Sequence, residues 1–571
     1  MNGGLATADY LIVAGFFAVM LGIGVYFAGR MKSLKTFFSG GHEVPWWVSG
    51  VSLWMTTFSA FAFVAYSELA YKHGMVAITI WWSSVPCCLI ATWIFAARWR
   101  RTAATSPVEY IETRYGSFLR QGFAWLGVPL VTIDDALKLF VIGKMMTVSL
   151  GMDAPGTLPI AVVACGGIML VYTLLGGLWA AMITDFVQFV VMAAAVLVLV
   201  PLALARVGGP VSFVEQTPEG FWALTGGGYT WAWLIPFFFI QFFAYATRWS
   251  YVQRFYAVRS DAEARKVGYL VAALTFFGMP LLFLPAMAAR VFMPGVTDTK
   301  DVYALLCGQL LPVGMLGMMI AAMFSATMST LSGDYNAVAS VITNDIYRRL
   351  FARRASDRSL VFAGRIATLA AGLASLGIAL LLAAAEGRKD LVEYMAQLFS
   401  VLLPPVAIPM MFGLVTRRAS NAGAIAAFVT GTVFGVTAYA ASYIEGWAYL
   451  RSIPYLPWIT SIPTLAALDV FSIILRDASE KREQVARFLD GLERHEVAPL
   501  KMDAQGNEAA GAIRVIGIAS AAMGAVLCIA VLATAPWRSA WVSIVVGAAM
   551  MIVGVGIGTL ARRFERAEGE R

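Results

Sequence analysis

The sequence is poor in charged residues. Only 13% of its 571 residues are Asp, Glu, Lys or Arg, whereas 60% are hydrophobic and the mean hydropathy is +0.74. A soluble domain needs more polar surface than this, so the composition excludes an ordinary soluble protein and indicates a chain folded in a lipid bilayer. Aromatic residues make up 13% of the chain, which suits rings anchored at the two membrane interfaces.

Histidine and cysteine are also scarce. None of His42, His73 and His495 lies in the middle of an apolar run, and no nucleophile–base pair or metal-ligand cluster is evident, which argues against a membrane enzyme. The five cysteines lie within apolar runs without zinc-site or disulfide spacing, so we expect small core residues. The N-terminus carries no basic stretch, so the run from Tyr10 predicts a first span and not a cleaved signal.

Apolar stretches long enough to cross a bilayer recur along the chain. Fifteen candidate spans lie near residues 8–29, 45–72, 75–98, 121–151, 157–175, 177–205, 229–255, 265–293, 312–345, 359–385, 390–416, 420–444, 455–475, 512–534 and 538–561. The chain is therefore predicted to be an all-α polytopic membrane protein.

Basic clusters follow the odd-numbered spans, as Arg98, Arg100 and Arg101 follow the third. By the positive-inside rule this pattern predicts an N-terminus outside and a C-terminus in the cytoplasm. The same clustering argues against nucleic-acid binding, despite a net charge of +8. We expect a multi-pass protein of the plasma membrane, the inner membrane of a bacterium, whose partner is the lipid bilayer.

The segment 476–511 is the one substantial polar stretch, and it has a partly helical period with an apolar stripe at Val485, Phe488, Leu489 and Leu492. We interpret it as a cytoplasmic amphipathic linker, with a regulatory surface as the alternative. It divides a body of 13 helices (1–475) from two additional transmembrane helices and a basic tail (512–571).

Polar residues inside the spans are candidates for function, because they are costly in hydrocarbon. The ninth span is the densest in hydroxyls, which belong to Ser325, Thr327, Ser329, Thr330 and Ser332, with Asp334 just beyond. A hard cation such as Na⁺ prefers several oxygen ligands, which hydroxyls and freed backbone carbonyls can supply. A single hydroxyl would more simply bond its own helix.

The second span carries a similar cluster, formed by Ser52, Thr56, Thr57, Ser59 and Ser67. Such a helix can unwind at mid-depth only where it lines a cavity. Discontinuous helices with freed carbonyls are the usual means by which transporters coordinate ions. Because this span has no internal proline, its hydroxyl density alone predicts the break.

Further features stand out in the apolar background. Gly176 and Gly177 predict a tight turn between the fifth and sixth spans, and Asp185 follows without a Lys or Arg nearby in sequence. A buried carboxylate of this kind needs a partner, naturally a bound cation or a proton.

In the fourth span Asp134 and Lys138 have the i,i+4 spacing of an ion pair, which could line a solute path or an outer vestibule. In the seventh span Gln241 is an isolated amide placed to bind a solute. Arg248 could snorkel, pair with a carboxylate or gate the inner exit.

These clusters together resemble the solute:sodium symporter family, which has the leucine-transporter fold. The resemblance covers roughly residues 8–475 and is carried by four segments in order, FFSGGHEVPWWVSGVSL, YTLLGGLWAAMITDFVQ, VQRFYAVRSDAEARK and MSTLSGDYNAVASVITNDIY. It implies two inverted five-helix repeats, spans 2–6 and 7–11, with the binding site at their interface.

The resemblance also implies a set of ligands. Na⁺ would be held by carbonyls of Met55, Phe58 and Ala326 and by hydroxyls of Ser329 and Thr330. Some members bind a second sodium at positions matching Asp185, Ser329 and Ser332. This chain has Gly333 where such members place another serine, so Asp185 could instead serve the ion's exit path.

For the solute, the matching positions are Thr57, Ser59, Trp81, Ser84, Asp134, Gln241 and Gln397. Sialic-acid-type carriers place an arginine near the position of Asp134, so an aspartate there argues against an anionic solute held in that way. Hydroxyls, amides and aromatics suit a sugar, a polyol or a zwitterion.

The sequence thus predicts a sodium-coupled symporter of a small polar organic solute, with Na⁺ as its ion, no organic cofactor and no obligatory protein partner. A proton-coupled carrier of the same fold, in which Asp185 titrates, is the alternative. A transporter-like membrane sensor acting through 476–511 is less favoured, because no catalytic module follows.

Overall fold

The computed structural model describes residues 5–28, 34–151, 154, 156–384, 391–493 and 506–569. Within these ranges the β-structure is limited to two isolated bridges, Val44 with Val258 and Gly226 with Tyr229. The helices are α1 (Thr7–Ala28), α2 (Leu34–Ser39), α3 (Trp46–Thr56), α4 (Ser67–His73), α5 (Met75–Trp82), α6 (Ser84–Ala91), α7 (Ala97–Arg101), α8 (Glu109–Arg114), α9 (Ser117–Ser149), α10 (Thr157–Arg206), α11 (Pro210–Gln216), α12 (Trp231–Thr247), α13 (Trp249–Tyr256), α14 (Asp261–Phe292), α15 (Val302–Leu310), α16 (Met315–Val341), α17 (Asp357–Ala384), α18 (Leu391–Val415), α19 (Asn421–Ala441), α20 (Leu456–Ile474), α21 (Ser479–Glu493), α22 (Gly506–Thr534) and α23 (Trp537–Gly569). Short 3₁₀ or π segments lie at Gly40–His42, Ala62–Tyr66, Thr92–Ala96, Thr299–Asp301, Ile342–Phe351 and Ala448–Arg451.

Long apolar helices dominate this architecture, as a bilayer requires. Among the described residues, 11 helices are long and apolar enough to cross a membrane. Each of the fifteen predicted spans falls on a helix or on consecutive helical segments. The all-helical membrane architecture is therefore confirmed, whereas the total of fifteen crossings and the orientation of the termini stay predictions.

Two helices are interrupted in the middle of predicted spans. The first interruption separates α3 from the π segment Ala62–Tyr66 and α4, with Thr57 to Ser59 outside helical structure. The second separates α12 from α13 at Arg248, whose ψ of 128° is extended. These are the second and seventh spans, the first members of the two expected repeats. The break predicted from hydroxyl density is thus confirmed, and another break lies in the second expected repeat.

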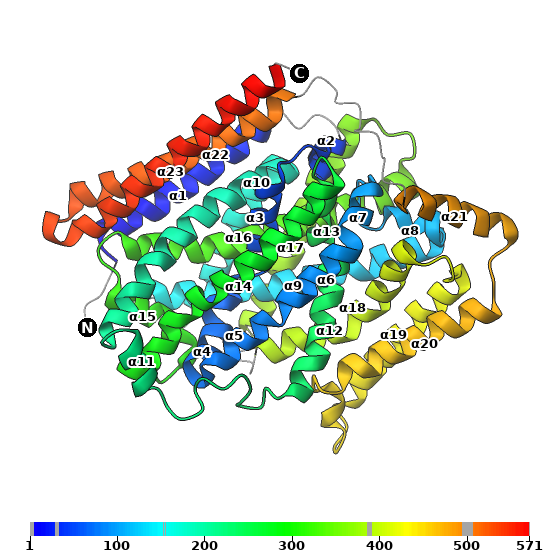
Figure 1. Cartoon of the computed structure of the whole chain (residues 1–571), viewed down its shortest axis with the longest axis horizontal. Helices are drawn as coiled ribbons and strands as arrows, with labels where there is room; N and C mark the ends of the chain where they lie inside the picture. Colours follow the sequence, from blue (N-terminus) through cyan, green and yellow to red (C-terminus); the bar gives the residue numbers. More distant parts are fainter. Residues whose placement is uncertain are drawn as a thin grey trace.

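The centre of the bundle is α16, in which every residue except Leu316 is buried. It contacts α1, α3, α9, α10, α13 and α17. Figure 1 shows α1, α22 and α23 as a layer along one side of the bundle, with α19 and α20 at the opposite end. The hydroxyl-rich helix is therefore shielded from lipid on all sides.

An aspartate of α1 caps the beginning of α16. Asp9 Oδ1 accepts hydrogen bonds from the backbone N–H groups of Gly314 (3.0 Å) and Gly317 (2.8 Å). A Cβ atom on Gly317 would lie 2.5 Å from the backbone oxygen of Asp9, so the two helices meet there without room for a side chain. The carboxylate thus satisfies N–H groups that a helix start leaves without an internal partner.

We expect Asp9→Ala to lower the free energy of unfolding by about 1–2 kcal/mol, because α16 loses this cap. Thermal unfolding of the detergent-purified protein measures the change. Asp9→Asn keeps one acceptor oxygen and serves as the control, with a smaller loss expected. An unchanged unfolding temperature in Asp9→Ala would show that the cap does not stabilise α16.

The predicted turn between the fifth and sixth spans is one residue wide. Gly177 interrupts the helical backbone of α10 with φ 59° and ψ −164°. A Cβ atom at this position would lie 2.9 Å from the backbone oxygen of Phe37. Glycine is required at this position both by the positive φ and by the close approach of the backbone at Phe37.

The polar segment after α20 forms the amphipathic helix α21. Its residues Val485, Leu489 and Leu492 are buried, and Phe488 stacks on Tyr110 of α8 with ring centroids 6.3 Å apart. The predicted apolar stripe is therefore confirmed. It faces α7, α8 and α18, while residues 494–505 of the predicted linker lie outside the described part.

Candidate functional site

The first part of the site is the interruption after α3. Thr57 Oγ1 donates to the backbone oxygen of Trp54 (2.6 Å), while the carbonyl of Phe58 accepts from the hydroxyl of Thr330 on α16 (2.6 Å). The same hydroxyl lies 3.0 Å from the carbonyl of Ala326. Thr330 Oγ1 therefore joins a carbonyl freed by the helix break to a carbonyl of the central helix.

The hydroxyls of α16 differ in their hydrogen-bond partners. Ser325 Oγ donates to the carbonyl of Ala321 one turn earlier (2.7 Å), and Ser332 Oγ donates to the carbonyl of Ser329 (3.1 Å). Thr327 Oγ1 instead accepts from the N–H of Ala60, just after the break (3.0 Å). Thr327 and Thr330 thus face the interruption. Ser325 instead bonds the backbone of its own helix, which is the simpler interpretation of a hydroxyl inside a span.

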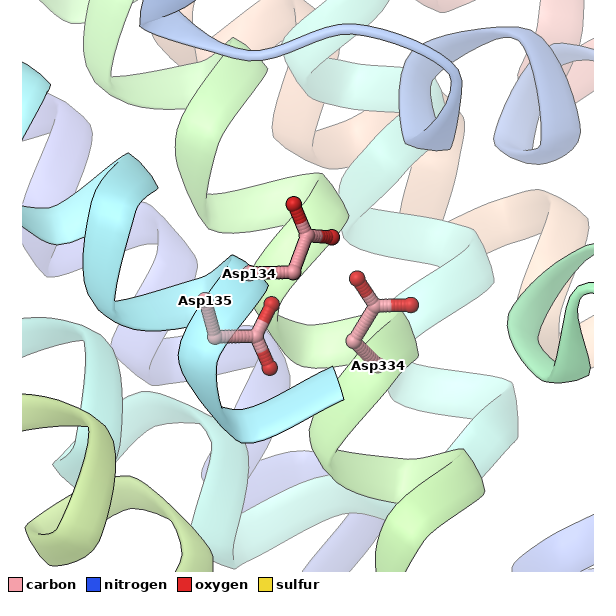
Figure 2. Close-up of side chains that lie close together, drawn as sticks. All are labelled: Asp134, Asp135 and Asp334. Carbon is pink, nitrogen blue, oxygen red and sulfur yellow. The ribbon is translucent and has the colours of Figure 1, made fainter. Parts of the chain in front are cut away.

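A buried charge cluster lies between α9 and α16. Lys138 Nζ contacts Asp134 (2.8 Å), Asp135 (2.9 Å) and Asp334 (2.7 Å). Arg248, from the break between α12 and α13, contacts Asp134 (2.5 Å) and Asp334 (2.8 Å) through Nη2. Figure 2 shows the three carboxyl groups gathered between the two helices. Three carboxylates and two cations give this cluster a formal charge of −1.

The predicted pairing of Asp134 with Lys138 is confirmed. Asp135 joins the pair from the same helix, whereas Asp334 and Arg248 join it from distant parts of the sequence. Oxygens of Asp134, Asp135 and Asp334 lie within 4.8 Å of one another, a spacing that would suit a metal ion. The ammonium of Lys138 contacts all three carboxylates and already supplies the positive charge there. The cluster is therefore an internal ion-pair network.

A cavity of about 130 Å³ lies beside the first interruption. Five predicted solute residues line it, namely Thr57, Ser59, Trp81, Asp134 and Gln241. Phe58 and Thr330 also line it, so the proposed ion ligands adjoin the proposed solute space. Lys138 and Arg248 bring the charge cluster to its wall. Its aromatic lining consists of Phe58, Phe61, Tyr66, Trp81, Phe237, Tyr245, Tyr251 and Phe399.

Two predicted solute residues lie off this lining. Ser84 Oγ donates to the carbonyl of Trp81 (2.6 Å), and Gln397 Nε2 donates to Glu393 (3.2 Å). The neighbour of Gln397, Ala396, lines the cavity in its place. A solute role for Ser84 or Gln397 stays a prediction.

Arg248 lines the cavity, although the resemblance did not assign it to the solute. Its guanidinium lies over the rings of Tyr251 (5.3 Å) and Phe399 (5.4 Å), and 13% of its side chain is exposed. An arginine thus reaches the cavity from α12–α13, although α9 carries Asp134 at the position compared with sialic-acid-type carriers. Of the roles left open for Arg248, pairing with carboxylates is the observed one.

Asp185 has a cationic neighbour that its local sequence did not reveal. It accepts from Ser52 Oγ (2.5 Å) and lies 3.5 Å from Arg254 Nη2 of α13. Both Asp185 and Arg254 are fully buried. Asp185 therefore already has a positively charged partner within the protein.

A cavity at the junction of two discontinuous helices, inside a helical membrane bundle, is typical of secondary transporters. The family model described as "Sodium:solute symporter family" matches residues 37–431. The chain belongs to this family, whose members are transporters and not enzymes.

Curated relatives agree with this assignment. The sodium/sialic acid symporter NanT of Aliivibrio fischeri is 25% identical over 442 residues, covering 73% of this chain and 85% of the relative. The sodium/glucose cotransporter 2 of Rattus norvegicus is 25% identical over 478 residues, covering 75% and 71%. The sodium/myo-inositol cotransporter 2 of Sus scrofa is 24% identical, covering 87% and 81%.

The fold is shared with a solved structure, described as the substrate-bound outward-open state of a Na⁺-coupled sialic acid symporter. The likeness has a TM-score of 0.72 at 22% identity and covers 84% of this chain and 100% of that one. At this identity the comparison establishes the architecture, and the chemistry of the site depends on the residues of this chain.

Proposed function

We propose that this protein is a sodium-coupled secondary active symporter that imports a small polar organic solute by alternating access across the plasma membrane, in a bacterium the inner membrane. The observation that carries the proposal is the contact between Thr330 Oγ1 and the carbonyl of Phe58, freed by the break after α3. A cavity with polar residues in its lining lies beside this contact, which supports an ion site that adjoins a solute site.

The proposed Na⁺ ligands are the carbonyls of Met55, Phe58 and Ala326 and the hydroxyls of Ser329 and Thr330. The hydroxyl of Thr330 already bridges two of these carbonyls. All five residues are buried, so a bound ion would be screened from water. Oxygen ligands without softer donors suit a hard monovalent cation.

Among a sugar, a polyol and a zwitterion, we favour a zwitterion as the solute. Asp134 and Arg248 reach one cavity from different helices, and each keeps a buried polar atom, Oδ1 and Nε respectively, without a hydrogen-bond partner in the described part of the chain. An ammonium group and a carboxylate of one solute would satisfy both. Thr57, Ser59 and Gln241 would bind its other polar groups.

The proton-coupled alternative depended on a titrating Asp185. The guanidinium of Arg254 lies 3.5 Å from Asp185, so this carboxylate has a cationic partner within the protein and needs no coupling proton to balance its charge. Sodium coupling therefore explains more of the site than proton coupling does.

Uptake into proteoliposomes tests the proposal. Labelled amino acids, betaines, sugars, polyols and carboxylates are offered with an inward Na⁺ gradient, and again with only a proton gradient. We expect accumulation of one zwitterionic compound under the Na⁺ gradient alone. Accumulation that follows protons would refute sodium coupling, and accumulation of a sugar or polyol would refute the solute class while leaving the symporter intact.

A further inference from the structure

The buried pair of Asp185 and Arg254 lies next to the proposed sodium site. Asp185 is on α10, and its carboxylate neighbours the hydroxyls of Ser52 and Ser329. Ser329 is also a proposed Na⁺ ligand, so the two places share a residue. A carboxylate with two hydroxyls, fully buried, would by its chemistry attract a cation.

The guanidinium of Arg254 fills the space next to this carboxylate. It is held by a bond from Nη1 to the carbonyl of Ser250 (2.8 Å) and by one from Nε to Ser52 Oγ (3.2 Å). Ser52 donates in turn to Asp185, so the same hydroxyl joins the cation to the anion. These two hydrogen bonds therefore hold the buried Arg254 side chain in position beside Asp185.

Gly333 makes this position possible. A Cβ atom built on Gly333 would lie 2.9 Å from Nη2, 3.1 Å from Nη1 and 3.3 Å from Cζ of Arg254. The guanidinium thus packs flat against the backbone of α16 where any other residue would carry a side chain. Alanine or serine at this position would have to displace the charged group.

We propose that Arg254 acts as a tethered cation that takes the place of a second ion at Asp185, so that the protein binds one Na⁺ per solute. This inference rests on the proposed sodium coupling through Thr330. The pair is formally neutral, and a second Na⁺ there would add an uncompensated charge in a fully buried place, which is strongly unfavourable. Gly333 is then the residue that sets the number of ions.

Equilibrium binding of radioactive sodium to the purified full-length protein in detergent, without solute, tests the inference. We expect the wild type to bind one Na⁺ and Asp185→Asn to bind one as well. Arg254→Gln should bind two, because Asp185 loses its internal cation, and Arg254→Gln/Asp185→Asn should return to one. Size-exclusion chromatography establishes that each variant is folded.

Gly333→Ala and Gly333→Ser give a second route to the same answer without deleting the arginine. Both should displace the guanidinium and allow a second Na⁺, and the serine should bind it more tightly because it adds a hydroxyl ligand. This pair decides the question if Arg254→Gln does not fold.

Two Na⁺ bound by the wild type, with one lost in Asp185→Asn, would overturn the inference. So would a single Na⁺ in folded Arg254→Gln and in both Gly333 variants. Failure of the proposed sodium coupling would give a different result. Na⁺ binding would then be the same in the wild type and in Thr330→Ala, with either arginine or glutamine at position 254.

Discussion

Thr330→Ala is expected to weaken Na⁺ binding by about 10- to 100-fold, because loss of one oxygen ligand at a buried site costs about 1–3 kcal/mol. Thr330 is the residue that joins the two halves of the proposed site. Its hydroxyl contacts the carbonyl of Phe58 at the helix break and that of Ala326 on α16. The Na⁺ dependence of intrinsic fluorescence or of isotope binding in the purified protein measures the affinity.

The same helix offers a matched control. Ser325 is equally buried, but its hydroxyl bonds only the carbonyl of Ala321 within α16. Ser325→Ala should leave the Na⁺ affinity within about twofold, and Thr330→Ser, which keeps the hydroxyl, should retain most of it. Equal losses in Ser325→Ala and Thr330→Ala would mean that general packing of α16, and not a ligand, determines Na⁺ binding.

Lys138→Met is expected to have the largest effect on stability, with a loss of about 3–5 kcal/mol or failure to accumulate folded protein. Lys138 Nζ contacts three buried carboxylates, two of α9 and one of α16. Its removal would take the formal charge of the cluster from −1 to −2, with Arg248 as the remaining cation. Thermal unfolding and the yield of monodisperse protein measure the loss.

Lys144 provides the control for this change. It is on the same helix and pairs with Asp298 at 3.4 Å, but its side chain is 31% exposed. Lys144→Met should therefore cost under about 1 kcal/mol. Adding Asp135→Asn to Lys138→Met restores a formal charge of −1 and should recover part of the stability. Similar unfolding temperatures for Lys138→Met and Lys144→Met would show that the cluster does not hold α9 to α16.

Much of the architecture could be predicted because hydrocarbon imposes simple rules. Apolar runs become helices, and each predicted span has helical structure at its position. The break between Thr57 and Ser59 was also predictable, since a group of hydroxyls in an apolar run is stable only beside a cavity. The extended residue Arg248 was not, because a single change of ψ leaves no compositional signal in its span.

The site was predictable where partners share one helix, as Asp134 and Lys138 do. Asp334 and Arg248 join the same cluster from α16 and from the break after α12, and sequence spacing cannot reveal contacts made by folding. For the same reason, the contact between Arg254 and Asp185 could not be predicted from the sequence. The reason for a glycine at position 333 is that a Cβ atom there would lie about 3 Å from the guanidinium of Arg254 on another helix. No local sequence pattern encodes that contact.

The burial of α16 has a consequence for motion. A helix that is packed on every side cannot tilt or slide without repacking all its neighbours, and close-packed interiors resist such shifts. Change of access should therefore be carried by segments that already lack continuous helical hydrogen bonds, Thr57–Ser59 and Arg248, which can act as hinges. In this mechanism α16 would be the stationary axis that bears three of the five proposed ion ligands, while the two broken helices bend around it to open one face of the membrane and then the other.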